Sequence, residues 1–353
     1  PGTLQVAEDL RAGRPVTGFQ PGISESFRHL WFQSFGCHTP SRMVGPDADV
    51  FECWGRATGD LDASTCLPQW LRHGAPLGII QHITPAGVFP SVSTDDPLPD
   101  PESLYSDLAG WTNYASAEDE PGVVADLLEA QEQKGHCKFF DSMPELCEFL
   151  DVSSVVLTKL ALITKEKADG NLKHRLIWDL LRSYVNSSVL LPERIVLPRV
   201  QDAVDDAADL LRMGYGGLEW LVLDIADAFH NVPLRPSQRR YCCGKVGNRF
   251  VVFLVLCMGG KSSPNIWGRY AACIGRILAS IFDPAEFRSE IYVDDPLLAV
   301  AGTAERRDLL LLLAELVDRR FGADQHSNDA SVAFYRSQEQ SSASLPPSVG
   351  VPT

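Results

Sequence analysis

The sequence predicts an α/β fold of the α+β kind, in which short strands and amphipathic helices alternate. Short apolar runs bounded by glycine or turn residues lie at 218–225, 250–256 and 291–300, and their length and composition are typical of strands. Segments 202–213 and 303–321 carry the apolar spacing of helices that bury one face. Strands and helices in this order indicate an antiparallel sheet backed by helices on one face.

Residues 1–150 are predicted to form a separate, partly irregular region whose role the sequence does not reveal. The turn-rich stretch from Pro90 to Pro101 has the composition of a linker. Glu118 to Glu120 and Pro121 then predict the start of a helix over 123–131, because acidic side chains favour the positive end of the helix dipole.

A second region, 151–335, begins where the pattern changes. Val155–Leu157 and Leu160–Ile163 favour extended structure. The segment 165–174 predicts a polar hairpin around Asp169-Gly170, since Asp-Gly is a typical hairpin turn.

Two helix boundaries are marked by single residues. Gly214 is expected to end the helix over 202–213, because glycine readily adopts the left-handed conformation that closes a helix. Ser262-Ser263-Pro264 predicts a capping hydroxyl before a proline at the first helical position, and so a helix that runs to about Ile281. The Ser-, Gln- and Pro-rich end, 336–353, has the composition of a disordered tail.

The acidity of the chain is concentrated in its first half. The net charge is -15, from 31 Lys and Arg against 46 Asp and Glu, and residues 1–150 hold 8 of the basic and 22 of the acidic residues. Residues 159–199 are locally basic, with 8 basic and 4 acidic side chains. Phosphate contacts normally come from Lys and Arg, so the modest positive charge of this segment favours contact with nucleic acid.

Neither a membrane span nor a secretory signal is predicted. The sequence has no run of about 18 uninterrupted apolar residues, and its first residues lack a charged start followed by an apolar core. We therefore expect an intracellular protein without a membrane partner. The nine cysteines show no Cys-x-x-Cys and no paired histidine spacing, so free thiols are expected rather than a zinc site.

Acidic residues end two of the predicted strands. Asp224 and Asp227 follow Leu221–Leu223, and Asp294-Asp295 follow Ile291–Val293. Burying like charges side by side is costly unless a cation neutralises them, so carboxylates on adjacent strands are natural ligands for Mg²⁺. Two such ions can activate an attacking hydroxyl and stabilise a leaving pyrophosphate. An isolated Asp-Asp pair before a proline would more simply be a polar hairpin turn.

Four blocks between about 155 and 322 resemble the reverse transcriptase family, of the retrotransposon type, and they follow the family's order. The first block, similar to the fingers hairpin, is Lys167-Ala168-Asp169-Gly170 with Lys173-His174-Arg175, Asp179 and Asn186. The second, similar to the first palm motif, is Asp224 to Phe229 with Val232-Pro233-Leu234 behind it. The third, Gly259 to Pro264, is similar to the loop and helix start that support the template and the incoming nucleotide, and the fourth, Tyr292 to Asp295, is similar to the signature tetrapeptide. The resemblance implies a right-hand polymerase fingers and palm that adds deoxynucleotides to a primer on an RNA or DNA template.

The resemblance also implies roles for individual residues. Asp224, Asp294 and Asp295 would be the catalytic carboxylates and, with the backbone carbonyl of Ile225, would hold two Mg²⁺ ions, or Mn²⁺ in their place. The residues that would bind the deoxynucleoside triphosphate are Lys165, Lys167, Arg175, Ala228, Phe229 and Met258. The residues that would contact template or primer are Tyr292, Gly259, Lys261, Ser263 and Pro264.

Two of these residues bear on the choice of substrate. The ring of Phe229 would press against the 2′ position of the incoming sugar, so that a deoxynucleotide fits and a ribonucleotide clashes. Alternatively, Phe229 is a core aromatic residue that packs behind the strand. Tyr292 also stands where RNA-directed RNA polymerases usually have glycine. The basic residues of the hairpin, taken alone, would simply be solvated.

The sequence departs from the family's pattern at two places. Cys257-Met258 stands where the family commonly has Pro followed by Gln, and Asp324-Gln325-His326 shows neither the glycine-and-lysine strand motif nor the primer-gripping hairpin expected next. Two hypotheses therefore remain open. The chain is either an RNA-directed DNA polymerase core or an inactive, domesticated remnant that acts as a binding module.

Overall fold

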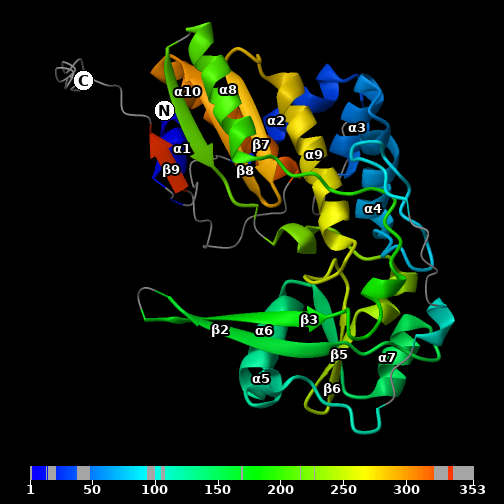
Figure 1. Cartoon of the computed structure of the whole chain (residues 1–353). Coiled ribbons are helices and arrows are strands. Elements are labelled where there is room, and N and C mark those ends of the chain that lie inside the picture. The colour runs from blue at the N-terminus through cyan, green and yellow to red at the C-terminus, as the bar shows by residue number, and fades with distance from the viewer. Residues whose placement is uncertain are drawn as a thin grey trace, which may run out of the picture.

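The chain folds into a mixed α+β structure with small antiparallel sheets, as the sequence predicts (Figure 1). The computed structural model describes residues 2–12, 14, 21–37, 48–93, 100–104, 108–167, 170–214, 216–225, 227–321 and 333–336. The four-stranded sheet with α8, α9 and α10 occupies one half of the molecule, and the long hairpin with a three-stranded sheet occupies the other.

The elements have the following bounds. The α-helices are α1 (Gly2–Arg11), α2 (Pro21–Ser34), α3 (Ala48–Thr58), α4 (Leu67–His73), α5 (Ala115–Glu118), α6 (Pro121–Gln133), α7 (Met143–Leu150), α8 (Val200–Met213), α9 (Ser263–Ile281) and α10 (Ala304–Phe321). The short helical turns are η1 (Asp62–Cys66), η2 (Pro101–Ser103), η3 (Asn186–Ser188), η4 (Ala228–Asn231) and η5 (Pro236–Tyr241). The strands are β1 (Cys137–Phe140), β2 (Lys159–Glu166), β3 (Leu172–Asp179), β4 (Gly217–Val222), β5 (Cys243–Val246), β6 (Arg249–Phe253), β7 (Phe287–Tyr292), β8 (Asp295–Gly302) and β9 (Ala333–Arg336).

The four-stranded sheet has the order β7-β8-β4-β9 and is antiparallel throughout. On one face Leu210 of α8 packs against Leu218 and Ala299. On the other face Leu298 and Val300 join the main core, toward α9 and α10. The prediction of helices on one face was therefore wrong. The residues of β8 that point to each face of the sheet are apolar, so helices can pack on both faces.

The second half contains the hairpin β2–β3 and the sheet β1-β6-β5. The predicted polar hairpin is confirmed, with Lys159 paired to Asp179 and Glu166 to Leu172. Of the predicted turn residues, Asp169 lies outside the described residues, and Gly170 has a φ of 79°. In the other sheet, Cys137 pairs with Phe253, so a strand from the first 150 residues completes a sheet formed by later ones.

Two predicted helix boundaries have different outcomes. Gly214 ends α8 in the left-handed conformation, as expected. Ser262 does not cap α9, because its own backbone is already helical, at φ -82° and ψ -21°, whereas a capping residue is extended. The hydroxyl of Ser263 instead donates to the carbonyl of Cys257 at 2.8 Å. The predicted tail lies outside the described residues from 337 onward.

A buried ion pair joins η1 to α9. The Nε of Arg269 lies 3.0 Å from Oδ2 of Asp62, and the guanidinium forms a second contact with the same carboxylate. A further Arg269 nitrogen donates to the carbonyl of Thr84 at 2.6 Å, and the guanidinium carbon lies 4.4 Å from the Trp70 ring centre. Both charged side chains are almost completely shielded from solvent, at 0% and 2% exposed.

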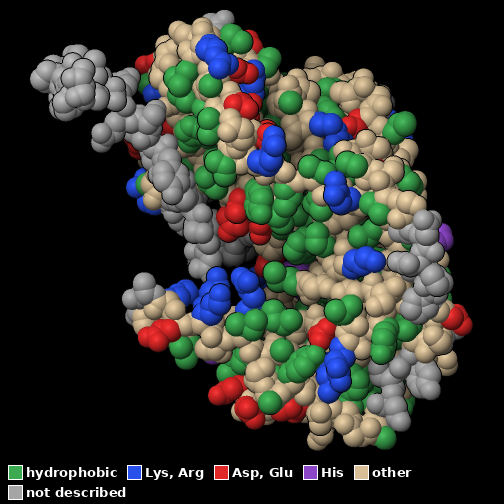
Figure 2. All heavy atoms as spheres, viewed as in Figure 1, with side chains coloured by type: hydrophobic (Ala, Val, Ile, Leu, Met, Phe, Trp, Pro, Cys, Tyr) green, Lys and Arg blue, Asp and Glu red, His purple; other side chains and the backbone are tan. Residues whose placement is uncertain are grey.

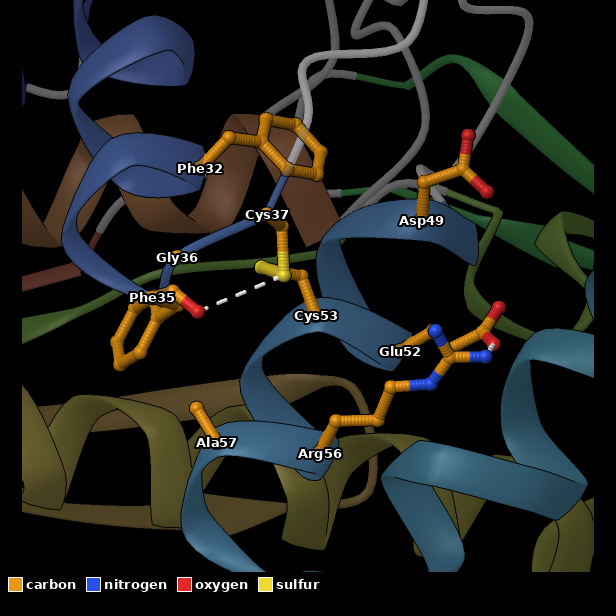
Figure 3. Close-up of a pocket in the computed structure, with 9 residues that line it drawn as sticks. All are labelled: Phe32, Phe35, Gly36, Cys37, Asp49, Glu52, Cys53, Arg56 and Ala57. Carbon is orange, nitrogen blue, oxygen red and sulfur yellow. Dashed lines mark hydrogen bonds and ion pairs between the residues drawn. A yellow bond between two sulfur atoms is a disulfide. The ribbon is translucent and has the colours of Figure 1, made fainter.

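A disulfide links the end of α2 to α3. Cys37 and Cys53, with Cα atoms 6.1 Å apart, form one wall of a cavity of about 620 Å³ (Figure 3). Phe32, Phe35 and Arg56 also line this cavity. The prediction of free thiols was therefore wrong for this pair, whose helices approach to bridging distance. The other cysteines are free. No helix of the described chain combines the length and apolar character needed to cross a bilayer.

Candidate active site

The turn between β7 and β8 carries the second acidic pair. Tyr292 pairs with Asp295, which leaves Val293 and Asp294 as the two turn residues. Val293 has a φ of 60°, a conformation that is strained for a β-branched residue. The indole N–H of Trp267, on α9, donates to the carbonyl of Val293 at 2.6 Å. The turn is therefore held in a strained shape by the helix beneath it.

Backbone hydrogen bonds join this turn to the end of β4. The N–H of Ile225 donates to the carbonyl of Asp294 at 2.8 Å, and the N–H of Leu223 donates to the carbonyl of Pro296 at 2.9 Å. Asp224 lies between these two bonded residues. The main chain of Asp224 is thus fixed directly beside the Asp294-Asp295 segment, some seventy positions later in the sequence. We call Asp224, Asp294 and Asp295 the carboxylate corner.

The carboxylate corner is electrostatically unfavourable. Burial raises the pKa of Asp224, the charge of Asp294 raises it further, and the positive charge of Lys173 acts in the opposite direction. Burial likewise raises the pKa of Asp295, followed by the charges of Asp294 and Asp224. Burial is the larger cause of both raised pKa values, and the neighbouring negative charges disfavour ionisation further. A cation bound between these groups would relieve that repulsion.

The donor chemistry of the corner suits a hard divalent cation, since carboxylate and carbonyl oxygens are the ligands that Mg²⁺ prefers. In the part of the chain that the structure describes, no three His, Cys, Asp or Glu side chains converge closely enough to hold a metal ion. Binding would therefore require Asp224, Asp294 and Asp295 to turn toward one another about their side-chain torsions. The backbone bonds already fix the segments that carry them.

Basic residues share one face of the β2–β3 hairpin. Lys165 pairs with Lys173, and Arg175 lies two residues farther along β3, so the three side chains point to the same side. Figure 2 shows Lys and Arg side chains on the hairpin side of a hollow and Asp and Glu side chains across it. Lys173 was not assigned to the site from sequence, although its pairing with Lys165 and its spacing from Arg175 were available signals.

A cavity of about 150 Å³ lies beside this basic face. Two residues predicted to bind the nucleotide, Arg175 and Met258, line it together. Its other lining residues are Leu127, Leu128, Gln131, His174, Leu176, Trp178, His230 and Phe253. The α6 residues among them come from the first 150 positions, where sequence analysis predicted no site residue. The backbone of Lys167 closes the end of the hairpin, its N–H donating to the carbonyl of Asn171 at 2.8 Å.

Ala228 and Phe229 lie in η4, directly after the first acidic strand end. Ala228 is buried, and Phe229 is half-buried and packs against the main hydrophobic core. This position is compatible with both predicted roles, the sugar gate and the core aromatic. The preceding residue, Asp227, has a φ of 51° and forms an ion pair with Lys134 at 2.6 Å. Lys134 follows α6, so the N-terminal half supports this loop.

Two histidines pack beside that ion pair. The rings of His136 and His230 have centres 4.8 Å apart. Burial, reinforced by the nearby His230, lowers the pKa of His136 to about 4. The His230 ring and the Lys134 ammonium hold the pKa of Asp227 below its usual range despite burial. Asp227 therefore stays ionised with a partner of opposite charge, unlike the three carboxylates of the corner.

The predicted template and primer residues separate into a loop and the turn. Asn186 bridges the loop, donating to the carbonyl of Gly259 at 2.9 Å and accepting from the N–H of Lys261 at 2.8 Å. The ammonium of Lys261 donates to the carbonyl of Val189 at 3.0 Å, so this cation stabilises the loop. Ser263 is buried and Pro264 is exposed.

Gly259 is required by the backbone at its position, whereas Tyr292 is exposed on the surface. Gly259 has a φ of 96°, and a Cβ atom there would lie 2.6 Å from the carbonyl oxygen of Trp178, so only glycine fits. Tyr292 is 55% exposed at the edge of the carboxylate corner, where a large apolar ring gains little from burial. Its position leaves it available to an external partner.

No family model and no curated protein matches the chain. Among solved structures, the chain is similar to the native crystal structure of prototype foamy virus protease–reverse transcriptase, with a TM-score of 0.39 and 16% sequence identity. The match covers 60% of this chain and 24% of the foamy virus chain. A similarity at this level assigns neither a family nor an activity.

Proposed function

We propose that this chain is the fingers and palm core of an RNA-directed DNA polymerase of the retrotransposon type, which adds deoxynucleotides to a primer. The observation that carries the proposal is the carboxylate corner. Asp224 and the Asp294-Asp295 segment are joined through the bond from Ile225 to Asp294, although they are remote in sequence. The raised pKa values of Asp224 and Asp295 support the same role, since they indicate charges that a cation would neutralise.

In this proposal the three carboxylates and the backbone carbonyl of Ile225 hold two Mg²⁺ ions, or Mn²⁺. When bound, the ions would supply charge stabilisation for the attacking primer hydroxyl and the leaving pyrophosphate. Lys165, Lys173 and Arg175 neutralise the phosphates from the hairpin side. Fixed cations that face a transferring phosphoryl group provide the electrostatic stabilisation that such displacements require.

Nucleotide selection is assigned to the loop after β4. Phe229 excludes a 2′ hydroxyl by its bulk, and Ala228 lets the sugar approach the backbone. The ion pair between Asp227 and Lys134 supports this loop from the N-terminal half. Met258 and Arg175, which line one cavity, are also assigned to contact the nucleotide. Lys167 keeps the nucleotide-binding role that the family resemblance implies. The template and primer roles stay with Gly259, Lys261, Ser263, Pro264 and Tyr292.

The second candidate function is a binding module derived from such a polymerase. It is favoured by the residues Asp324-Gln325-His326, which lack the primer-gripping pattern, and by Met258 at a position that commonly carries a polar residue. In that case the fold would bind a partner without extending a primer.

Primer extension on an RNA template separates the two functions. The chain is incubated with a labelled DNA primer, deoxynucleotides and Mg²⁺ or Mn²⁺, beside the double variant Asp294→Asn, Asp295→Asn. The polymerase proposal predicts elongated products from the parent chain and at least a thousandfold loss in the double variant, about 4 kcal/mol of transition-state stabilisation. No product from the parent chain with either metal would favour the binding module.

A further inference from the structure

One disulfide stands among free thiols in the part of the chain that the structure describes. Cys37 and Cys53 are bonded to each other, and the other seven cysteines are unpaired. Five of the unpaired cysteines are buried, namely Cys137, Cys242, Cys243, Cys257 and Cys273. Burial raises the pKa of Cys137 to about 12 and raises the pKa of Cys257 well above its ordinary value. A thiol reacts as its thiolate, so these buried groups exchange poorly with disulfides.

The Cys37–Cys53 disulfide is placed differently, because it borders the cavity of about 620 Å³ beside α3 (Figure 3). Its two sulfur atoms are unequally shielded, since Cys37 is half-buried whereas Cys53 is only 3% exposed. A cavity of this volume admits a small organic molecule. A small thiol therefore reaches the disulfide in the folded chain, and it reaches Sγ of Cys37 first.

A cation lines the same cavity. Arg56 follows Cys53 by about one turn of α3, and its guanidinium pairs with the carboxylate of Glu52. Positive charge near a cysteine favours its thiolate form, and a thiol that forms a stable thiolate leaves a disulfide faster. Attack at Cys37 expels Cys53, so the position of Arg56 favours this direction of exchange.

The two helices joined by the disulfide are anchored differently. On α3, the indole N–H of Trp54 donates to the hydroxyl of Ser280 at 3.1 Å, and the Phe51 ring packs edge-on against Tyr270 with ring centres 5.7 Å apart. Both partners belong to α9, so α3 stays on the main core without the disulfide. The end of α2 has the buried side chains of Trp31 and Phe32 as its apolar anchor. Breaking the disulfide leaves the end of α2 to these apolar contacts.

We propose that the Cys37–Cys53 disulfide is a site of thiol–disulfide exchange with a small thiol, and that its reduction loosens α2 from α3. The thiolate of the small thiol attacks Sγ of Cys37 and forms a mixed disulfide there, while Cys53 leaves as a thiolate and takes up a proton. A second small thiol then attacks the bound one, which releases Cys37 as a thiol. One protein disulfide is reduced, and two small thiols are oxidised to one disulfide. The inference is independent of polymerase activity.

Reduction of the full, oxidised chain by glutathione tests the exchange site. Samples are quenched with acid and alkylated, and the state of each cysteine is read by peptide mass spectrometry. We expect the disulfide to open under native conditions, in which the buried thiols stay at least tenfold slower to alkylate. Cys147→Ser is the matched control, because Cys147 is also half-buried, and it should open the disulfide within about twofold of the parent rate.

Two single-cysteine variants test the order of attack. With oxidised glutathione, Cys37 in Cys53→Ser should form a mixed disulfide at least tenfold faster than Cys53 in Cys37→Ser, because only Cys37 is half-buried. Equal rates, or faster reaction at Cys53, would overturn the assignment of Cys37 as the attacked sulfur.

Hydrogen exchange of the parent chain tests the structural consequence. Reduction is expected to speed amide exchange at the end of α2 at least tenfold and to change exchange in α9 by less than about twofold. A disulfide that opens only at urea concentrations that unfold the chain would overturn the inference, and so would unchanged exchange of α2 after reduction. Neither result bears on the polymerase proposal, which primer extension tests separately.

Discussion

Charged side chains leave bulk water at two places in this molecule, with opposite outcomes. Asp62 and Arg269 are almost fully buried, yet their opposite charges pair and a further guanidinium N–H donates to the carbonyl of Thr84. In the carboxylate corner, Asp224 is half-buried and Asp295 is exposed, and each lies near a further negative charge. The first arrangement pairs opposite charges within the chain, whereas the second brings like charges together.

The contrast teaches which region serves stability and which serves function. A buried pair of opposite charges, joined by two hydrogen bonds, links η1 to α9 within the chain. Like charges around a strained turn cost stability, and arrangements of this kind concentrate at functional sites. The two regions are joined by one helix, since α9 carries both Arg269 and Trp267, which holds the Val293 turn.

The largest expected effect comes from breaking the buried pair. Asp62→Ala leaves the Arg269 guanidinium buried without its counter-charge, so we expect the free energy of unfolding to fall by about 3–5 kcal/mol. Urea unfolding followed by tryptophan fluorescence measures this change. Arg212→Ala is the control, because it removes an exposed pair with Asp209 and should cost less than about 0.5 kcal/mol. Similar losses in the two variants would contradict the distinction.

A smaller effect of opposite sign is expected from the carboxylate corner. Asp294→Asn removes a charge that repels Asp224 and Asp295, so without divalent cations the variant should be more stable than the parent by about 0.5 kcal/mol at pH 7, after screening by solvent. The two carboxyl groups have folded pKa values above the unfolded value of about 3.9. Their favourable contribution is therefore complete below that pH and is lost as the pH rises through the folded values.

The stability difference between Asp294→Asn and the parent should consequently shrink as the pH falls from 7 toward 4. Thermal unfolding in a metal-chelating buffer across this range measures it. A parent chain that is more stable than the variant at pH 7 under these conditions would show that the corner is not a site of repulsion.

Strand and helix elements were predictable where local pattern and tertiary packing agree. The hairpin, α8, α9, α10 and the β7–β8 pair were all expected from apolar spacing and turn residues. The second helical layer was missed because Ala299 and Ala301 do not distinguish a buried face from an exposed one by sequence alone. The missing cap at Ser262 depends on a backbone angle, and the Cys37–Cys53 bond depends on how two helices approach.

Residues of the candidate site were predictable only where a motif carries them. Asp224 and the Asp294-Asp295 pair follow predicted strands, so a metal-binding role could be predicted for them from the sequence alone. Lys134 and His136 were missed because they lie some ninety residues before the loop that they support. The ammonium of Lys261 was expected at a nucleic acid but bonds to a carbonyl of its own chain. Such partners follow from tertiary contacts, which no local pattern encodes.

The most direct test of the carboxylate corner is its affinity for a divalent cation. Mn²⁺ is titrated into the full chain, and the free ion is followed by electron paramagnetic resonance, with the double variant Asp294→Asn, Asp295→Asn beside it. We expect saturable binding by the parent chain and at least a tenfold weaker affinity in the double variant, about 1.4 kcal/mol. Equal Mn²⁺ affinity in the two proteins, or no binding by the parent, would contradict a metal-binding corner.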